Sequence, residues 1–225
     1  MDARICASIA ASTMSEMERK VEQALGLGAD LVELRLDYLS EINVNAVSAT
    51  IRRFGGRVIV TLRPSWEGGR FDGGEGERVR VLSEIAEVGP AYVDIELDAP
   101  DLGEVAEKLR EKTSLIISKH DLDGSLNIGE LRAAVSRALK LGKIAKVVTT
   151  AKTISHNLKI LSLYRDFPPG RLIAFAMGEL GTISRILSPL IGAPIAYACL
   201  PGEAVAPGQL TIGELREFLE LVRGR

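Results

Sequence analysis

Cysteine and histidine are scarce in this sequence, which contains two residues of each. Cys6 and Cys199 both fall inside apolar runs, a setting that suits buried free thiols in a reducing compartment better than a disulfide framework. Two cysteines and two histidines, scattered along the chain, do not form the clustered ligand set of a zinc site. These absences predict a cytoplasmic protein with neither a structural disulfide nor a metal cofactor.

Strong net charge and long apolar stretches are also absent. The formal net charge is -2, so the chain offers no electrostatic footprint for nucleic acid or for a membrane surface. No apolar run is long enough for a membrane span or a signal peptide. The turn after the first expected strand, ASIAASTMSE, lacks the glycine fingerprint of a dinucleotide site, and no P-loop occurs. We therefore expect no nucleic-acid partner, no membrane partner and no cofactor.

Short β-rich runs instead alternate with helical patterns along the chain, as in consecutive βαβ units with a parallel sheet. Eight such units in 225 residues, without an internal linker, predict a single domain, 1–225, with the α/β fold of a (β/α)8 TIM barrel. A doubly wound open sheet is the alternative. The expected strands cover residues 4–10, 31–37, 57–63, 92–97, 114–121, 144–151, 171–178 and 194–200. The expected helices lie near 13–27, 44–54, 75–88, 102–111, 127–141, 153–166, 180–190 and 211–223.

The expected strand LVELRLD alternates strictly between apolar and charged residues. This alternation puts Glu33, Arg35 and Asp37 on one face. In a parallel barrel the helices cover the outer face, so these charges are expected to point into the lumen. Other strands carry polar residues with the same spacing near their carboxyl ends: Thr61 with Arg63, Asp94 with Glu96, Ser118 with His120, and Lys146 with Thr150.

Inward charges allow two interpretations. They converge at the end of the barrel where active sites of this fold are built, which favours a ligand site. Alternatively, Glu33, Arg35, Asp94 and Glu96 form an ion-pair layer that braces the barrel, since lumen charges are unfavourable unless they pair or contact a ligand. The sequence leaves both interpretations open for these four residues.

Lys146 lies inside an apolar strand, within GKIAKVVTTA. Burial would lower the pKa of its ammonium, and a neutral amine among apolar walls is suited to attack a ketone. A lone strand lysine more often extends its charged head to solvent. In a barrel, however, it shares the lumen with His120, which titrates near neutral pH and is able to take and return a proton. Alone, His120 would fit a core or helix-capping role, but together the two residues favour chemistry.

Two loops are expected at the same end of the barrel. The segment Glu67–Glu75, EGGRFDGGE, is too rich in glycine to be rigid and is either a mobile lid or an ordinary flexible loop. Glu67 begins it close to Arg63, where a carboxylate would orient a catalytic base. The second loop, 203–209, ends in APGQ before the last helix, where backbone amides would meet an anion or a hydroxyl-rich substrate.

Six short motifs occur in the order of the expected strands: ELRLD at 33–37, TLRPSWEGG at 61–69, SKHD at 118–121, the strand with Lys146, MGELGTISR at 177–185 and APGQ at 206–209. No single motif is long enough to identify a family, but all six in this order along nearly the whole chain form a specific pattern. In these motifs the sequence resembles the type I 3-dehydroquinate dehydratases of the shikimate pathway.

The resemblance implies a lyase that removes water from 3-dehydroquinate, its small-molecule substrate, to give 3-dehydroshikimate. Lys146 matches the lysine that forms a Schiff base with the substrate ketone, and His120 matches the general acid and base that Glu67 orients. Arg185 matches the arginine that clamps the substrate carboxylate. The remaining matches surround the substrate: Glu33, Arg35, Arg63 and Gln209 near its hydroxyls, and Met177 and Tyr197 as walls.

The sequence also departs from the family pattern. Val205 stands where the family often has serine, so one hydroxyl contact is in doubt, and Tyr197 replaces a common phenylalanine. A Schiff-base aldolase on the same barrel would share Lys146, but the phosphate-type glycine turn near the last two strands is missing. A non-catalytic binding barrel is a third hypothesis. A homodimer is one option for assembly, although the sequence carries no clear interface pattern.

Overall fold

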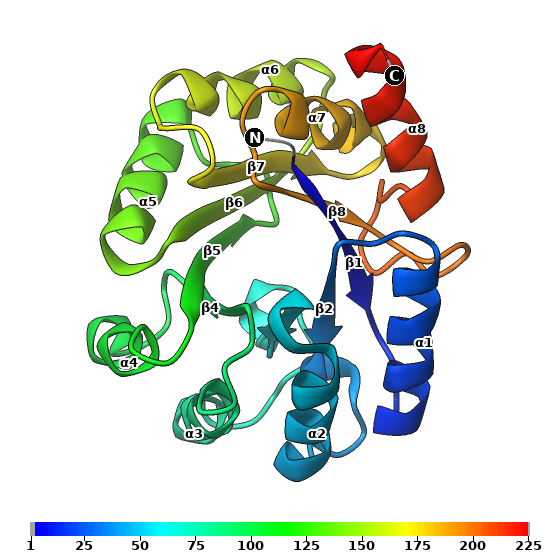
Figure 1. Cartoon of the computed structure of the whole chain (residues 1–225). Helices are drawn as coiled ribbons and strands as arrows, with labels where there is room; N and C mark the ends of the chain where they lie inside the picture. Colours follow the sequence, from blue (N-terminus) through cyan, green and yellow to red (C-terminus); the bar gives the residue numbers. More distant parts are fainter. Residues whose placement is uncertain (1–2, 225) are drawn as a thin grey trace.

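A ring of parallel strands forms the centre of the computed structural model, which describes residues 3–224 (Figure 1). Within those residues eight strands are hydrogen-bonded in the order β7-β6-β5-β4-β3-β2-β1-β8. No ladder joins β7 to β8 in the described chain, so the barrel is nearly closed. The strands are β1 (Arg4–Ile9), β2 (Leu31–Arg35), β3 (Val58–Thr61), β4 (Tyr92–Glu96), β5 (Ser114–Asp121), β6 (Ile144–Thr150), β7 (Leu172–Met177) and β8 (Ile195–Ala198).

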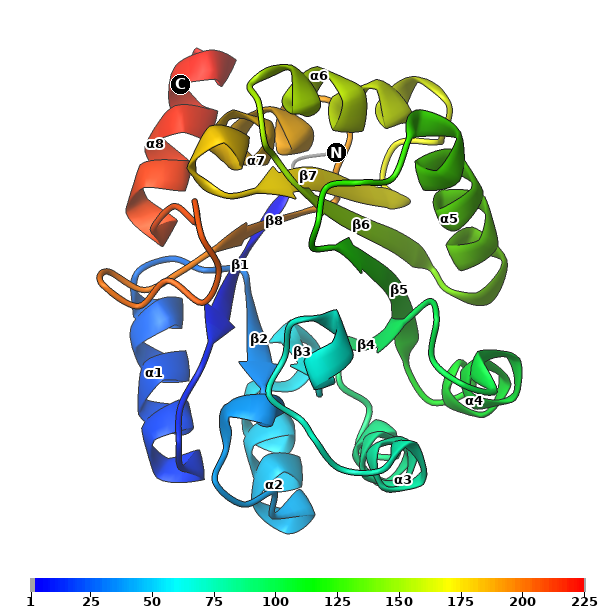
Figure 2. The same cartoon turned by 180° about the vertical axis from the view of Figure 1, so that it is seen from behind.

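Helices surround the ring on its outside, as opposite views of the molecule show (Figure 1, Figure 2). The arrangement confirms the predicted (β/α)8 TIM barrel. The doubly wound open sheet is wrong, because the strands follow one another in chain order without a reversal and the last strand, β8, pairs with the first, β1. α6 and α7 are shorter than the expected 153–166 and 180–190 because 3-10 turns take up the ends. The helices are α1 (Met14–Gly26), α2 (Val44–Phe54), α3 (Glu75–Ala86), α4 (Leu102–Leu109), α5 (Ile128–Leu141), α6 (Ser155–Leu161), α7 (Thr182–Leu187) and α8 (Ile212–Arg223).

Strand alternation divides the side chains of the barrel into two layers. On β4, Val93 and Ile95 point outward into a core shared with the helices, whereas Tyr92, Asp94 and Glu96 face the lumen. The lumen is filled by apolar side chains at the amino ends of the strands, as is usual for this fold. Most polar residues of the lumen lie in its carboxyl-terminal half, whereas Arg4, at the amino end of β1, donates a hydrogen bond to the Tyr92 hydroxyl at 2.8 Å. The apolar lumen layer includes Cys6, Leu31, Ile59, Tyr92, Ile116, Ile144, Ile173 and Ile195.

Strand ends differ most from the prediction. β2 ends at Arg35, and Asp37 lies in the 3-10 turn η1 (Leu36–Tyr38), so the prediction that Asp37 continues the inward face of the strand is wrong. β3 ends at Thr61, which leaves Arg63 just beyond the strand. Alternation identifies the two faces of a strand but does not mark the residue at which its ladder stops.

Backbone hydrogen bonds hold the first half of the glycine-rich segment after β3. The Phe71 amide donates to the Arg63 carbonyl at 3.1 Å, and the Ser65 amide donates to the Phe71 carbonyl at 3.0 Å. A Cβ on Gly69 would lie 2.1 Å from the Arg63 carbonyl oxygen, so only glycine permits this close approach. These contacts fold the first half of the segment against Arg63, and the flexibility of the segment stays a prediction.

We predict that Gly69→Ala destabilises the protein and that Gly76→Ala stabilises it. The methyl group at position 69 would overlap the Arg63 carbonyl, and such overpacking typically costs about 1–3 kcal/mol. Gly76 lies exposed in α3 with nothing within 4 Å of a Cβ, so alanine there should add about 0.5–1 kcal/mol. Urea unfolding measures both free energies, and equal effects of the two substitutions would contradict this account of Gly69.

Candidate active site

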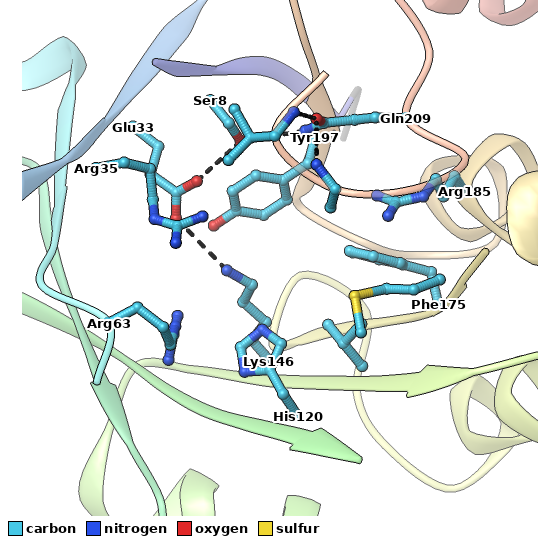
Figure 3. A pocket seen from close by; sticks show the side chains of 14 residues that line it. Ser8, Glu33, Arg35, Arg63, His120, Lys146, Phe175, Arg185, Tyr197 and Gln209 are labelled. Carbon is cyan, nitrogen blue, oxygen red and sulfur yellow. Dashed lines mark hydrogen bonds and ion pairs between the residues drawn. The ribbon is translucent and has the colours of Figure 1, made fainter. Parts of the chain in front are cut away.

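Side chains from six strands, α7 and two loops line a cavity at the carboxyl end of the barrel (Figure 3). Its volume is about 60 Å³, and a second cavity of about 320 Å³ adjoins it. Arg35, Arg63 and His120 line both cavities, which makes them one continuous site. The structure brings together every residue that the sequence placed here: Glu33, Arg35, Arg63, Glu67, His120, Lys146, Met177, Arg185, Tyr197 and Gln209.

Lys146, on β6, is buried in the lumen rather than extended to solvent, with 5% of its surface exposed. Its Nζ donates to Asp94 Oδ2 at 3.1 Å and lies 3.6 Å from Glu33 Oε1. The same nitrogen lies 4.3 Å from the centre of the Tyr197 ring, within cation–π distance. Two carboxylates and an aromatic face therefore hold the amine at the base of the cavity.

His120, on β5, reaches Glu67, which lies in the 3-10 turn η3 (Ser65–Glu67) after β3. Its Nδ1 is 2.9 Å from Glu67 Oε2. Burial raises the pKa of the Glu67 carboxyl to about 7, although the Arg63 charge opposes this. Burial, followed by the charges of Arg63 and Lys146, holds the pKa of the His120 imidazole well below its usual range. Above pH 7 the pair is thus a carboxylate that accepts the Nδ1 proton and a neutral imidazole with a free Nε2 lone pair.

Arg63 joins the acidic residues of the lumen. Its Nη2 donates to Asp94 at 2.7 Å, and its Nη1 donates to Glu96 at 2.6 Å and to the Ser118 hydroxyl at 2.7 Å. Glu67 lies 3.5 Å from Nη1. Burial raises the pKa of Asp94, but the charges of Arg63 and Lys146 and the hydrogen bond from Ser118 together outweigh burial and hold that pKa below its usual range. For Asp94 and Glu96 the structure bears out the ion-pair layer, because both bond a buried arginine.

Glu33 and Arg35 share the inward face of β2 but have different partners. Glu33 accepts hydrogen bonds from the Ser8 and Thr61 hydroxyls, each at 2.8 Å. Arg35 forms two hydrogen bonds to the Asp37 carboxylate, at 2.8 and 2.7 Å. Asp37 has left the strand, yet it neutralises Arg35 from the following turn. The two β2 residues are thus anchored separately rather than paired with each other.

Arg185, on α7, brings a buried positive charge that no acidic side chain neutralises within residues 3–224. Its Nη2 donates to the Pro207 carbonyl at 3.3 Å, and its Nε has no partner in this part of the chain. Burial lowers the pKa of this guanidinium to about 10. The group lies 4.4 Å from the centre of the Phe175 ring. A buried cation in this position is complementary to an anionic group on a ligand.

Gln209 closes the loop before α8 onto the barrel. Its Oε1 accepts hydrogen bonds from the amides of Val205 and Ala206, at 2.9 and 3.3 Å. Its Nε2 donates to the Ser8 hydroxyl at 3.3 Å. The expectation that the amides of this loop meet a ligand is therefore wrong for these two, because the glutamine side chain occupies them.

Ser8 and Phe175 line the cavity but were not assigned to it from the sequence. Ser8 lies two residues after Cys6 on β1, and Phe175 lies two residues before Met177 on β7, so both belong to inward faces. The alternation that identified Glu33 and Lys146 is the signal that would have found them.

Neither a metal site nor a membrane-spanning helix is found among residues 3–224. Between residues 3 and 224, no group of three or more His, Cys, Asp or Glu side chains is placed to hold a metal ion. In that range no helix has both the length and the apolar composition needed to cross a membrane.

A family model described as type I 3-dehydroquinase matches residues 5–225. The chain belongs to this family. It is 37% identical over 220 residues to a 3-dehydroquinate dehydratase of Dehalococcoides mccartyi, a match that covers 97% of this chain and 95% of that protein. A Methanococcus maripaludis 3-dehydroquinate dehydratase is 34% identical over 221 residues, covering 97% and 99%. The crystal structure of the Geobacillus kaustophilus 3-dehydroquinate dehydratase superposes with a TM-score of 0.91 at 28% identity, covering 100% of this chain and 92% of that one.

We predict that Glu67→Gln raises the stability of this family member above pH 7. The Glu67 carboxyl has a pKa of about 7 in the folded protein against 4.5 in the unfolded chain. Between these values the unfolded chain loses its proton first, so folding becomes less favourable as pH rises and the effect is complete above pH 7. The difference corresponds to about 3 kcal/mol, which glutamine would remove.

Urea unfolding of both proteins from pH 4 to pH 8 measures the effect. His120 contributes with the opposite sign, because its lowered pKa means that stability falls as pH falls below 6.5. His120 is neutral in the folded and unfolded chains at pH values well above 6.5, so the difference between the two proteins near pH 8 reports Glu67. Glu84→Gln, an exposed change on α3, is the control that should show no such pH dependence. A difference that is constant from pH 4 to pH 8 would contradict the raised pKa.

Proposed function

We propose that the chain dehydrates 3-dehydroquinate to 3-dehydroshikimate and water through a Schiff base on Lys146. This is the dehydratase step of the shikimate pathway, which leads to chorismate and the aromatic amino acids. The observation that carries the proposal is a buried lysine amine that shares one cavity with an imidazole held by a buried carboxylate. Membership of the type I family and the names of its relatives support the substrate.

Lys146 is the proposed nucleophile. The Lys146 amine, after releasing one proton from its ammonium form, attacks the C3 ketone of the substrate. The resulting carbinolamine takes up a proton as it loses water, which gives an iminium. The iminium accepts electron density from the adjacent carbon, which makes a proton on C2 acidic. The walls of the lumen favour this step, because they keep bulk water from the amine and from the imine.

His120 is the proposed base and acid. With Glu67 ionised, Nδ1 keeps its proton and Nε2 is free to remove the C2 proton. The imidazolium formed then protonates the C1 hydroxyl as it departs, so elimination releases one water and restores neutral imidazole. Hydrolysis of the product imine returns Lys146 as an amine. One histidine thus serves both proton transfers, and Glu67 sets its tautomer.

The other lining residues are proposed to bind the substrate. The unneutralised guanidinium of Arg185 fits the substrate carboxylate, which offers two parallel hydrogen-bond acceptors. Glu33, Arg35, Arg63 and Gln209 are the polar residues of the cavity wall that we propose for its hydroxyls. The walls are formed by Met177 and Tyr197, with Phe175 beside them.

We expect 3-dehydroquinate with borohydride to add the mass of the reduced substrate to a peptide that contains Lys146. Borohydride reduces the imine to a stable secondary amine, and mass spectrometry of the digest locates it. Lys143, which is exposed before β6, and Lys152, which is exposed after it, are internal controls. Labelling on either of them, or no labelling, would refute the Schiff base at Lys146.

We expect His120→Ala to separate the two halves of the reaction. Imine formation depends on Lys146 and should persist in the trapping assay, whereas turnover should fall by about 10²–10⁴-fold without the general base. His156→Ala, on α6 outside the cavity, should leave turnover unchanged. Normal turnover of the His120 variant would exclude this residue as the base.

A further inference from the structure

Arg78 is a buried charge that the proposed reaction does not use. It lies on α3, outside the ring of strands, and 0% of its surface is exposed (Figure 1). Its Nε and Nη2 donate to the Glu75 carboxylate at 2.9 and 2.6 Å, and its Nη1 donates to the Leu62 carbonyl at 3.3 Å. Nη1 also donates to Glu96, a residue of the lumen. A guanidinium behind the barrel wall is thus bonded directly to the site.

Glu96 is shared between two arginines, with one oxygen for each. Oε1 accepts from Arg63 at 2.6 Å, and Oε2 accepts from Arg78. Arg63 in turn bonds Asp94, the partner of Lys146, and lies 3.5 Å from Glu67. Arg78 is therefore connected through Glu96 and Arg63 to both halves of the reacting centre.

We propose that Arg78 is a positioning residue that fixes Glu96 from outside the barrel and thereby fixes Arg63 between Asp94 and Glu67. The bond to the Leu62 carbonyl anchors the same guanidinium to the residue directly before Arg63, which reinforces the placement. Arginine suits this position because its planar fork serves Glu75, Glu96 and a carbonyl at once, whereas lysine is a point charge. The role in turnover rests on the proposed dehydratase function; the role in the charge network does not.

Removing Arg78 changes the network in a defined direction. Glu96 would keep Arg63 as its cation but lose the partner of Oε2, and a buried carboxylate in that position takes up a proton more readily. Protonated Glu96 holds Arg63 less strongly, so Arg63 is free to approach Glu67. Both changes stabilise the ionised form of Glu67.

The charged and titratable groups that face Glu67 are Arg63, Glu96, His120 and Lys119. Arg63 and Lys119 lower the pKa of its carboxyl, and the charge of Glu96 raises it. Loss of the Glu96 charge and a closer Arg63 therefore act in the same direction. The pKa of Glu67 should fall below about 7 when Arg78 is replaced by a neutral residue.

Nuclear magnetic resonance of the histidine side chains tests this inference without reference to activity. The chain has two histidines, so His120 reports the ionisation of Glu67 through their hydrogen bond, and His156 is the internal control. In Arg78→Met the midpoint of the His120 transition should move to lower pH by about 1 unit. Arg78→Lys keeps the charge and should move it less. Arg80→Met, an exposed change on the same helix, should leave the midpoint unchanged.

A double-mutant cycle tests the route through Glu96. Glu96→Gln alone should lower the midpoint, and adding Arg78→Met to it should produce no further shift. The double variant removes both charges together, so it also avoids an unpaired buried charge. If Arg78→Met alone does not fold, the comparison of Glu96→Gln with the double variant decides the question.

Turnover of 3-dehydroquinate provides the second readout. Arg78→Met should lower kcat/KM by about tenfold, and Arg80→Met by less than about twofold. A folded Arg78→Met protein with an unchanged midpoint, or a full extra shift in the Glu96→Gln background, would overturn the inference. An inactive wild-type protein would instead refute the dehydratase proposal and leave the titration result valid.

Discussion

Charges inside the lumen of this barrel are shielded from water, so each is stable only beside an opposite charge or a hydrogen-bond partner. This constraint determines the arrangement of the whole site. Arg63 is the cationic partner of three carboxylates, and its contacts fix the positions of Asp94, Glu96 and Glu67. The network then reaches the lysine on one side and the histidine on the other. It combines bracing with function, because the same ion pairs that stabilise the lumen also set the positions and proton affinities of the groups proposed to react. Arg185 is the exception, and its unneutralised charge identifies the side of the cavity that suits an anion.

Much of the fold and the site follows from two periodicities in the sequence. Alternating βα units gave the barrel, and alternation within strands put Glu33, His120 and Lys146 on inward faces before any contact was known. The pairing of side chains did not follow, because it depends on the register between strands. Asp37, the partner of Arg35, lies in a turn, although the periodicity of the sequence predicts that it belongs to the strand. The sequence predicts that Glu67 lies near Arg63. It does not predict the raised pKa of Glu67, because the burial that causes the shift exists only in the folded chain.

Arg78 shows a different limit of sequence reasoning. It shares a helix face with Val81, Leu82 and Ile85, at spacings of three, four and seven residues, which is the buried face of α3. An arginine in that stripe is a visible signal. The partner of Arg78, however, is not predictable from the sequence. Glu96 lies on the next strand, β4, and its Oε2 faces α3 only in the assembled barrel. The close approach of Gly69 to the Arg63 carbonyl was likewise not predictable, since composition does not show which glycines contact backbone.

The apolar layer across the lower lumen limits the route by which molecules reach and leave the cavity. Side chains such as Leu31, Ile59 and Ile116 close the barrel beneath Lys146, so the lysine amine is accessible from one end only. In the proposed reaction, substrate, product and each released water would share that single opening. The cavity is therefore a blind pocket rather than a tunnel. In the proposed reaction, a product still bound to Lys146 would keep the next substrate out, so the pocket would have to empty before the next cycle.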